Sequence, residues 1–582
     1  MRFLSVLLVM GWLLLPAHAQ EPSALLEAAR NERLESWRRD HRLIDLHQHI
    51  EGRPERIERA VKIMDAVGIG IGVNLSGGTT LKEGEKPSAL ERNIALFEEV
   101  APGRFVQYMN LDYSGFDEEG WGERAAAQVE AGFRQGAAGL KEYKRLGLYL
   151  RHADGTLIAI DDPKLDPVWA KCGELGLPVS IHVADPKAFW APFDESNERW
   201  IELKDHKDWW FGDPDKYPPR EELLAARNRV IQKHPKTTFV CLHFANNPED
   251  VVQVGKWLEK YPNMMVDLAA RVPEIGRHDP KVVRDIFVKH QDRILFATDF
   301  MVYGRLILGS GGDGPAPTDA DAIDFYEKHW RFLETNDRSF AHMTPIQGDW
   351  TIDAIGLPEG VLRKIYFDNA RKLLAKSLPA PVATAQRVDE EVGLDPRAEA
   401  WNVCEPVYID QQSLTTEAKP ALETEVRLAW SDTHLTLRYH CPYTELTVFE
   451  PPMKDGERMG LWDKDVIEAF IAPDAGNAKR YVEVEVAPTN ERLDVLVDLP
   501  EKDFDWSSGA ETKVLIDEEA KVWWAVVRIP WTAFGKQPNA GDRWKMNLYR
   551  CDRAGEASLA WRPVLRGSFH APDRFGLLEF AE

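Results

Sequence analysis

Eight apolar segments alternate with helical patterns between residues 43 and 299 of this 582-residue chain. Most are continuous apolar runs, which is typical of parallel strands buried on both faces. Eight strand–helix units predict an α/β fold, a (β/α)₈ TIM barrel, rather than a doubly wound open sheet. The expected strands are Leu43–Ile50, Gly68–Leu75, Arg104–Leu111, Ala137–Tyr143, Pro178–Val183, Thr237–Ala245, Met264–Ala269 and Ile294–Asp299, with helices such as Pro22–Arg39, Arg53–Val67, Asp117–Arg134 and Pro219–His234 before and between them.

The sequence changes character after this region. Residues 377–386, "SLPAPVATAQ", are rich in proline and alanine and predict an extended linker. Short alternating runs such as "RYVEVEVAP" and "VWWAVVRIP" then follow, separated by Asp, Gly, Pro and Asn. They predict an all-β domain, an antiparallel β-sandwich over residues 387–582, after a barrel over residues 20–376.

The N-terminus has the pattern of a secretory signal. Arg2 precedes an apolar stretch at Phe3–Leu15, and "AHA" at residues 17–19 offers a small-x-small cleavage site. A membrane span needs about 20 apolar residues, so this stretch is too short to be one. We therefore expect a signal peptide at residues 1–19 and an exported protein, periplasmic or extracellular.

Charge and cysteine content limit the partners and the covalent cross-links. The net charge is −23 and no compact basic patch offsets it, which disfavours nucleic acid and anionic membranes as partners. Cys172 and Cys241 are expected to be buried thiols in the barrel. One disulfide among Cys404, Cys441 and Cys551 is an open alternative in an oxidising compartment.

Histidine and aspartate stand where several of the barrel strands end. In "LHQH" the side chains of His47 and His49 project to the same side of an extended strand. His182, His243 and Asp299 follow later strands in the same way. The carboxyl ends of barrel strands meet at one mouth, and imidazole is a ligand for zinc, iron or manganese. A lone histidine at a strand end is usually structural, but five such positions together predict a metal site.

The motifs "DLHQHI", "FATDF" and "IYFDNARKLL" resemble the amidohydrolase superfamily over about residues 40–376. The branch that they resemble includes aminocarboxymuconate-semialdehyde decarboxylase and several lactonases. The resemblance implies one divalent metal, commonly Zn²⁺, bound by His47, His49, His182 and Asp299. Asp299 would also accept a proton from the attacking water, and His243 would polarise the substrate or transfer protons.

The fourth strand leaves the number of metal ions open. Binuclear members of the superfamily carry a carboxylated lysine there, and Lys141 in "GLKEYK" is the candidate for a second metal. Lys144 is three residues away, so only one of the two lysines can face the interior of a regular strand. We expect a single metal ion and assign Lys141 to substrate binding.

Two loops provide further candidates for substrate binding. A long insertion after the fifth strand contains Glu198, Arg199 and four tryptophans, Trp190, Trp200, Trp209 and Trp210. Its aromatic and charged side chains suit a sugar-like or aromatic substrate, although a lid packed on itself is an equal alternative. Arg305, in a glycine-rich segment after the eighth strand, is a candidate for binding an anionic group.

The C-terminal domain resembles the family 9 carbohydrate-binding modules through "LWDKDVIEAFI", "GDRWKMNLYRC" and "SFHAPDRFGLLEF". The resemblance implies that Trp462 stacks on a sugar and that Glu468 hydrogen-bonds to it. Phe569 stands where the family has a second tryptophan, and Glu483 where it has an arginine. Sugar binding and a purely structural role are both open.

We therefore expect an exported, divalent-metal-dependent hydrolase of a small substrate, a sugar-derived lactone or an ester or amide, with a module for saccharides. One alternative is a metal-dependent decarboxylase of a small unsaturated or aromatic carboxylic acid. Another is a non-catalytic carbohydrate-binding protein on a barrel scaffold. A glycosidase would need two facing carboxylates, and the spacing of Glu142 and Glu198 does not support that pairing.

Overall fold

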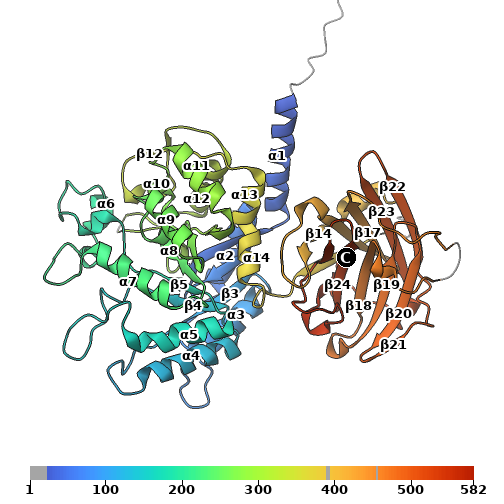
Figure 1. Ribbon diagram of the computed structural model, residues 1–582, viewed down its shortest axis with the longest axis horizontal. Helices are drawn as coiled ribbons and strands as arrows, with labels where there is room; N and C mark the ends of the chain where they lie inside the picture. The colour runs from blue at the N-terminus through green and yellow to red at the C-terminus, as the bar shows by residue number, and fades with distance from the viewer. Residues whose placement is uncertain (1–21, 313, 389–392, 454–456) are drawn as a thin grey trace, which may run out of the picture.

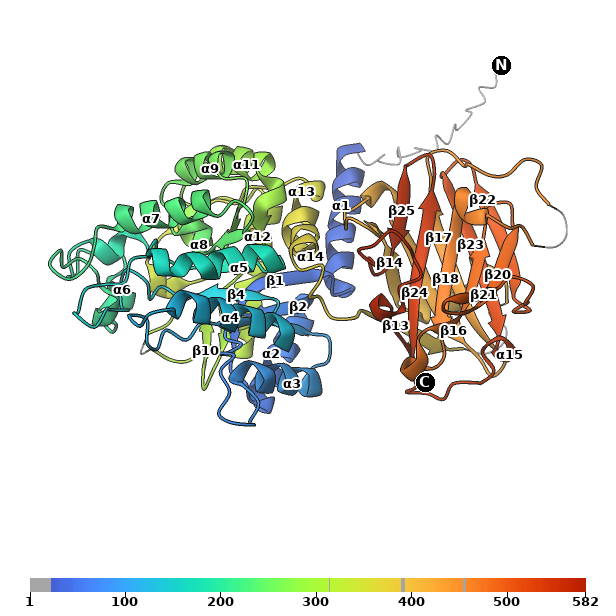
Figure 2. The same cartoon turned by 60° about the horizontal axis from the view of Figure 1, so that its bottom comes forward.

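The computed structural model describes residues 22–582 except residue 313 and the segments 389–392 and 454–456. The signal peptide predicted at residues 1–19 lies outside the described residues. Figure 1 shows two domains side by side, one of helices and strands coloured blue to yellow and one rich in strands coloured orange to red. In the turned view of Figure 2, helix α1 (Pro22–Arg39) lies between them.

The first domain is a closed barrel of eight parallel strands, as expected. The strands pair in chain order from β1 to β8, and the N–H of Leu46 on β1 closes the circle by donating to the carbonyl of Phe296, just after β8, at 3.0 Å. Each strand lies inside its expected range because the apolar runs are buried on both faces. The strands are β1 (Leu43–Ile50), β2 (Ile69–Asn74), β3 (Phe105–Asn110), β4 (Gly139–Glu142), β5 (Val179–Ile181), β6 (Phe239–Cys241), β7 (Met264–Asp267) and β8 (Ile294–Leu295).

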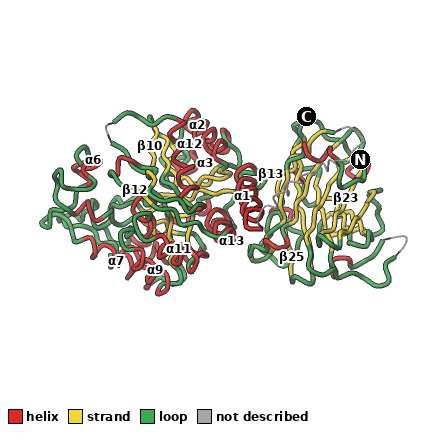
Figure 3. Tube along the Cα trace, turned by 90° about the horizontal axis from the view of Figure 1, so that it is seen from above, coloured by secondary structure: helices red, strands yellow, loops and turns green. Residues whose placement is uncertain are grey.

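Helices surround the barrel, as Figure 3 shows from above. Helix α2 illustrates why they form where they do: a proline stands in its first turn, Gly68 ends it in the left-handed conformation, and its buried residues follow the helical period. The helices are α2 (Pro54–Val67), α3 (Ala89–Val100), α4 (Trp121–Gln135), α5 (Asp166–Leu175), α6 (Trp200–Leu203), α7 (Arg220–Lys233), α8 (Leu242–Ala245), α9 (Val251–Lys260), α10 (Val272–Ile275), α11 (Pro280–Lys289), α12 (Asp319–Glu334), α13 (Glu359–Arg363) and α14 (Asn369–Leu373).

Two hairpins extend the barrel domain. Strand β9 (Phe300–Val302) pairs in parallel with the end of β1, and β10 (Leu306–Leu308) returns antiparallel along β9. Strands β11 (Phe340–Ala341) and β12 (Thr351–Ile352) form a separate pair. The first hairpin begins directly after Asp299 and holds this residue beside the end of β1, at the barrel mouth.

The second domain is the expected, mostly antiparallel β-sandwich. Side chains from the two halves of its strand path, such as Ile467 on β18 and Leu437 on β17, belong to one apolar core. The strands follow the order β21 (Glu501–Asp503), β20 (Arg492–Asp498), β19 (Arg480–Val486), β18 (Val466–Ala472), β24 (Arg543–Asp552), β26 (Gly576–Phe580), β13 (Val382–Arg387), β16 (Thr424–Trp430), β17 (His434–Pro442), β23 (Val522–Pro530) and β22 (Glu511–Asp517), with β14 (Pro406–Ile409), β15 (Gln411–Gln412), β25 (Ala557–Ala560) and helix α15 (Trp531–Phe534) outside it.

The structure corrects two expectations about this region. The linker predicted at 377–386 is too long, because β13 at Val382–Arg387 pairs in parallel with both β26 and β16. Only residues 377–381 join the domains. All five cysteines are free and buried, so Cys404, Cys441 and Cys551 form no disulfide with one another. Burial raises the pKa of Cys551, and of the other four thiols, which keeps them protonated and unreactive.

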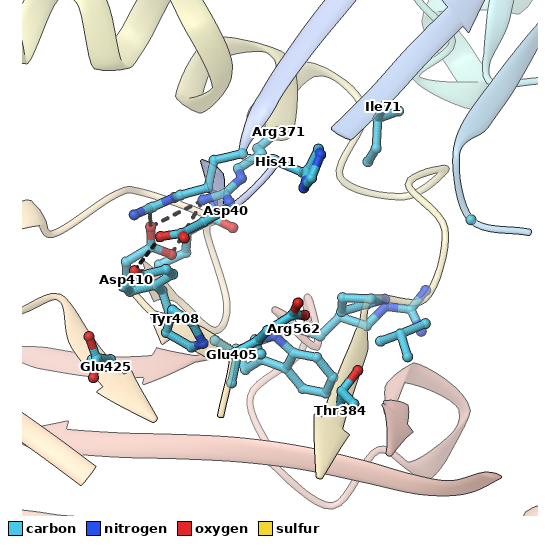
Figure 4. Close-up of a pocket in the computed structure, with 18 of the residues that line it drawn as sticks. Asp40, His41, Ile71, Arg371, Thr384, Glu405, Tyr408, Asp410, Glu425 and Arg562 are labelled. Carbon is cyan, nitrogen blue, oxygen red and sulfur yellow. Dashed lines mark hydrogen bonds and ion pairs between the residues drawn. The ribbon is translucent and has the colours of Figure 1, made fainter. Parts of the chain in front are cut away.

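A buried ionic network joins the two domains. Asp410, after β14, accepts hydrogen bonds from Arg42 at 2.7 Å, Arg363 at 2.6 Å and Arg371 at 3.1 Å, and these three arginines belong to the barrel domain. Figure 4 shows Asp410 beside Arg371, together with Tyr408, whose hydroxyl donates to Asp40 at 2.6 Å. The side chains of Asp40, Arg371, Tyr408 and Asp410 line a pocket of about 930 Å³ between the two domains. Since Arg42 precedes β1, the module docks on the amino ends of the strands, opposite the mouth.

Candidate metal centre

Three side chains converge at the carboxyl ends of β1 and β8. The Nε2 atom of His47 lies 3.3 Å from the Nε2 atom of His49 and 3.3 Å from Oδ1 of Asp299. The Nε2 atom of His49 lies 3.6 Å from the same oxygen. All three residues are buried. The rule that alternate residues of a strand share a face places His47 and His49 together, and closure of the barrel brings Asp299 to them.

Hydrogen bonds on the far side of each ring orient the two imidazoles. Nδ1 of His47 lies 2.9 Å from Oδ2 of Asp267, and Nδ1 of His49 lies 2.6 Å from Oγ of Ser76. An ionised carboxylate only accepts, so with Asp267 ionised the proton of His47 is on Nδ1 and the lone pair on Nε2. Oδ1 of Asp299 is buried and has no hydrogen-bond donor among the described residues. Lone pairs that face one another in this way fit a divalent cation.

Burial sets the protonation of the group. It lowers the pKa of His47 and His49 well below the ordinary value of 6.5, so both rings are in the neutral form that binds metals. Burial also raises the pKa of Asp299 to about 7, because it removes the water that stabilises the ionised carboxylate. The positive charges of Lys141 and Arg271 offset only part of this shift. A bound cation would return Asp299 to its ionised form.

His243 lies beside this group on an unusual turn. Its ring centroid is 5.0 Å from that of His47, and one of its ring nitrogens lies within 4.8 Å of ligand atoms of His47 and Asp299. Its backbone has a φ of 56°, and left-handed angles continue through Asn246. Each such residue costs about 1–2 kcal/mol. The N–H of His243 donates to Oδ1 of Asp267 at 2.6 Å, which holds the strained turn in place.

His182 is a neighbour of the group, but its Nε2 atom has partners elsewhere. Its ring centroid lies 4.3 Å from that of His243. Its Nε2 atom lies 3.0 Å from the carbonyl oxygen of Ala184 and 3.4 Å from Oδ1 of Asp185. The geometry therefore brings together His47, His49, His243 and Asp299, with His182 beside them and turned to its own loop.

The two lysines of the fourth strand occupy different places. Lys141, at the end of β4, is buried. Burial lowers its pKa to about 8, and the negative charges of Asp299 and Asp267 oppose that shift. Lys144 lies beyond the strand, and its Nζ donates to Asp185 at 2.5 Å. Strand alternation therefore does not decide between the two lysines, because only Lys141 belongs to β4.

The other expected substrate-binding residues already have partners in the protein. Arg199 is buried and pairs with Glu274 at 2.9 Å, and Glu198 pairs with Arg277 at 3.1 Å. Arg305 donates to the carbonyl oxygen of Gly314 at 3.0 Å. The insertion after β5 also packs on itself: Trp210 donates to Ala191, Trp190 to Pro218, Trp209 stacks on His206, and Trp200 packs against Phe193. These contacts favour the self-packed lid over an aromatic wall of the pocket.

The residues expected to bind sugar line one pocket of the C-terminal module. Trp462, Glu468, Glu483 and Phe569 surround a cavity of about 750 Å³. Phe569 stacks on Tyr549 with ring centroids 4.1 Å apart. The loop before β18 and the segment before β26 thus meet over the sheet, which the sequence alone does not show.

Sequence reasoning missed three polar residues that position the group. Asp267 stands at the end of β7, so the strand-end rule that identified Asp299 would have found it. Ser76 and Asp185 lie in loops after β2 and β5, where nothing in the local sequence distinguishes them from other loop residues.

Comparison with known proteins identifies the family. The family model for amidohydrolases matches residues 39–376, and the chain belongs to this family. Membership supports a hydrolase or a related lyase. It agrees with the strand-end group described above, since the superfamily usually binds divalent metals.

Individual relatives are distant. An "Extracellular protein" of Arthroderma benhamiae is 25% identical over 225 residues, which are 35% of this chain and 99% of that protein. The 2,6-dihydroxybenzoate decarboxylase of Rhizobium is similar in structure, with 18% identity and a TM-score of 0.33, over 57% of this chain and 98% of that one. A family 9 carbohydrate-binding module of Caldicellulosiruptor kristjanssonii, solved with cellotriose, is 15% identical with a TM-score of 0.27. The match covers 34% of this chain and 94% of that module.

Among residues 22–582, apart from the gaps stated above, no helix is long and apolar enough to cross a membrane.

Proposed function

We propose that this protein is an exported hydrolase that depends on one divalent metal ion, Zn²⁺, and cleaves a small sugar-derived lactone or an ester or amide. The observation that carries the proposal is the convergence of His47 Nε2, His49 Nε2 and Asp299 Oδ1 within 3.3–3.6 Å. Imidazole and carboxylate in this combination are the donors of catalytic zinc sites. His182 would join them by turning its ring from Ala184.

The residues around the group have roles that follow from their chemistry. A divalent metal with an open coordination position acidifies a water molecule and polarises a carbonyl oxygen. Asp299, whose buried Oδ1 atom has no donor among the described residues, is placed to accept a proton and pass it on. His243 is buried and its Nδ1 atom is fixed by the carbonyl of Ala269 at 2.9 Å, so its Nε2 atom is available to the substrate. Lys141 would bind an anionic oxygen of the substrate.

The location and the module complete the proposal. Export is supported by the signal pattern at residues 1–19 and by a relative that is named an extracellular protein. The C-terminal module would keep the enzyme close to saccharides through Trp462, Glu468 and Phe569, which share one pocket.

Product analysis tests the reaction. The purified mature chain is loaded with Zn²⁺, its metal content is measured, and it is assayed on lactones, sugar esters, amides and hydroxybenzoates while proton release and CO₂ release are recorded separately. The proposal predicts one zinc per chain and, without CO₂, either proton release from a lactone or ester or amine release from an amide, abolished in Asp299→Asn. Release of CO₂ would identify a decarboxylase instead. Two metal equivalents per chain would assign Lys141 to a binuclear centre. Inactivity on every substrate with no bound metal would favour a binding protein.

A further inference from the structure

The C-terminal module contains a second cluster of ionisable side chains. Glu468 on β18 is the antiparallel partner of Glu485 on β19, and Glu483 precedes Glu485 by two residues. All three side chains therefore project from one face of the sheet. Their carboxylate oxygens lie within 4.8 Å of one another, and the three residues are buried. Like charges opposite each other in a strand pair are destabilising, so this cluster needs protons or a compensating cation.

No lysine or arginine among the described residues forms an ion pair with these three side chains, although Lys502 and Arg553 line the same pocket. Both oxygens of Glu485 and Oε2 of Glu483 are buried without a hydrogen bond. The nearest basic side chains are engaged elsewhere: Lys502 donates to Nε2 of His570 at 2.5 Å, and Arg553 donates to the carbonyl of Trp462.

His570 itself does not supply the missing charge. Its Nδ1 atom lies 3.8 Å from Oε2 of Glu483, which is beyond hydrogen-bond distance. Burial and the adjacent Lys502 lower its pKa to about 4, so the ring is neutral. The carboxylate oxygens of Glu483 and Glu485 therefore face the cavity without an ion pair to Lys502 or Arg553, which line it with them.

The cavity is too large and too aromatic for an ion alone. Its volume is about 750 Å³, and Trp462, Phe504 and Phe569 line it together with the three glutamates. Pockets for small organic ligands have volumes of about 300–1,000 Å³. Aromatic faces stack on rings and attract cations through their quadrupole. Carboxylates beside aromatic walls thus form a site for a ring-sized organic cation.

We propose that this pocket binds an amino sugar whose primary ammonium group is held by Glu468, Glu483 and Glu485 while its ring lies against Trp462 and Phe569. An ammonium group donates three hydrogen bonds and has no acceptor, which matches three carboxylates. The inference rests on the proposal that the module binds saccharides and specifies their charge. A divalent ion would satisfy the carboxylates but would leave the aromatic walls without a ligand.

Titration calorimetry on the full chain at pH 7 tests this inference. D-Glucosamine is compared with D-glucose and N-acetyl-D-glucosamine, which have the same ring without the charge. We expect glucosamine to bind at least tenfold more tightly than either, and Glu485→Gln and Glu483→Gln each to remove that preference. The control is Glu511→Gln, which changes an exposed carboxylate of the same module that lies outside the pocket and pairs with Arg528 at 3.3 Å, and it should bind like the wild type. Thermal unfolding verifies that each variant folds.

Other results would overturn it. Equal affinity for glucose and glucosamine would mean that the module binds sugar without reading charge. Binding of Ca²⁺ that is lost in Glu485→Gln, without binding of glucosamine, would assign the carboxylates to a metal ion. Failure of all these ligands to bind would leave a cluster that is protonated and structural. None of these measurements depends on the activity of the barrel, so they are separable from the test of the proposed hydrolase.

Discussion

The Oδ2 atom of Asp267 on β7 lies 2.9 Å from the Nδ1 atom of His47 on β1. Both side chains are almost completely buried. The second oxygen of the same carboxylate accepts the backbone N–H of His243. One aspartate thus positions two histidines of the candidate metal centre, one on β1 and one on the turn after β6. Partners of this kind fix the tautomer and the orientation of metal ligands.

Replacing Asp267 by Asn should weaken metal binding. The amide has one acceptor oxygen for two donors, so either His47 or the N–H of His243 loses its partner. Loss of such a partner reduces metal affinity about 10–100-fold, and competition with a chelating dye measures it. Asp292→Asn is the matched control, because Asp292 pairs with Lys364 at the surface. Unchanged affinity in Asp267→Asn would contradict the orienting role.

Substitutions of His47 and His243 should separate metal binding from proton transfer. His47→Asn is expected to lose the metal, since it removes a proposed ligand. His243→Asn should retain one metal per chain and lower turnover by about 10²–10⁴, the contribution of a positioned acid or base. Metal analysis and steady-state kinetics on the same preparations distinguish the two. Loss of metal from His243→Asn would make that histidine a ligand.

Asp410→Asn should loosen the docking of the module. The change leaves the buried Arg42 and Arg363 and the partly buried Arg371 with less counter-charge, and breaking a buried ion pair costs about 3–5 kcal/mol. Chemical denaturation and protease sensitivity of residues 377–381 measure it. Asp319→Asn, which removes the half-exposed pair with Arg59, should change stability by about 1 kcal/mol or less.

Acid should act on the same contact. The three arginines hold the pKa of Asp410 well below its ordinary value of 3.8. A depressed folded-state pKa gives stabilisation that is complete above the unfolded value and is lost as the pH falls through the folded value. We therefore expect the wild type, but not Asp410→Asn, to lose this contribution below about pH 4, measured by denaturation at several pH values.

The glutamate cluster should produce the opposite pH dependence. Burial raises the pKa of Glu468 from 4.5 to about 8, and repulsion from Glu483 adds to that shift. Burial also raises the pKa of Glu483 to about 7, although the charge of Lys502 opposes the shift. A raised carboxyl pKa gives stability that is complete below the unfolded value and is lost as the pH rises through the folded value. The melting temperature of the ligand-free module should therefore fall between pH 5 and pH 8.5. Glu485→Gln should lessen that fall by about 2–4 °C or more, and an unchanged profile would contradict the shifts.

Local sequence determined the barrel and most of the candidate centre. The eight strands lie where continuous apolar runs predict them, because strands that are buried on both faces consist mostly of apolar residues. His47 and His49 share a face through strand alternation alone, and Asp299 and His243 follow from the rule that barrel strands end at one mouth. Each of these features follows from the pattern of its own strand and the residues directly after it.

Only the tertiary structure decided the features made by distant segments. Residues 377–386 predict a linker because they are rich in proline and alanine. Val382–Arg387 becomes strand β13 only by pairing with β16 and β26. The sequence predicts that Arg199 faces the substrate, but in the structure Arg199 is buried and forms an ion pair with Glu274, 75 residues further along the chain. The ionic contact of Asp410 with Arg42 likewise joins two domains. Hydrogen bonds and ion pairs across such separations leave no periodic trace in a sequence, because the energy of each contact depends on the burial that the whole fold creates.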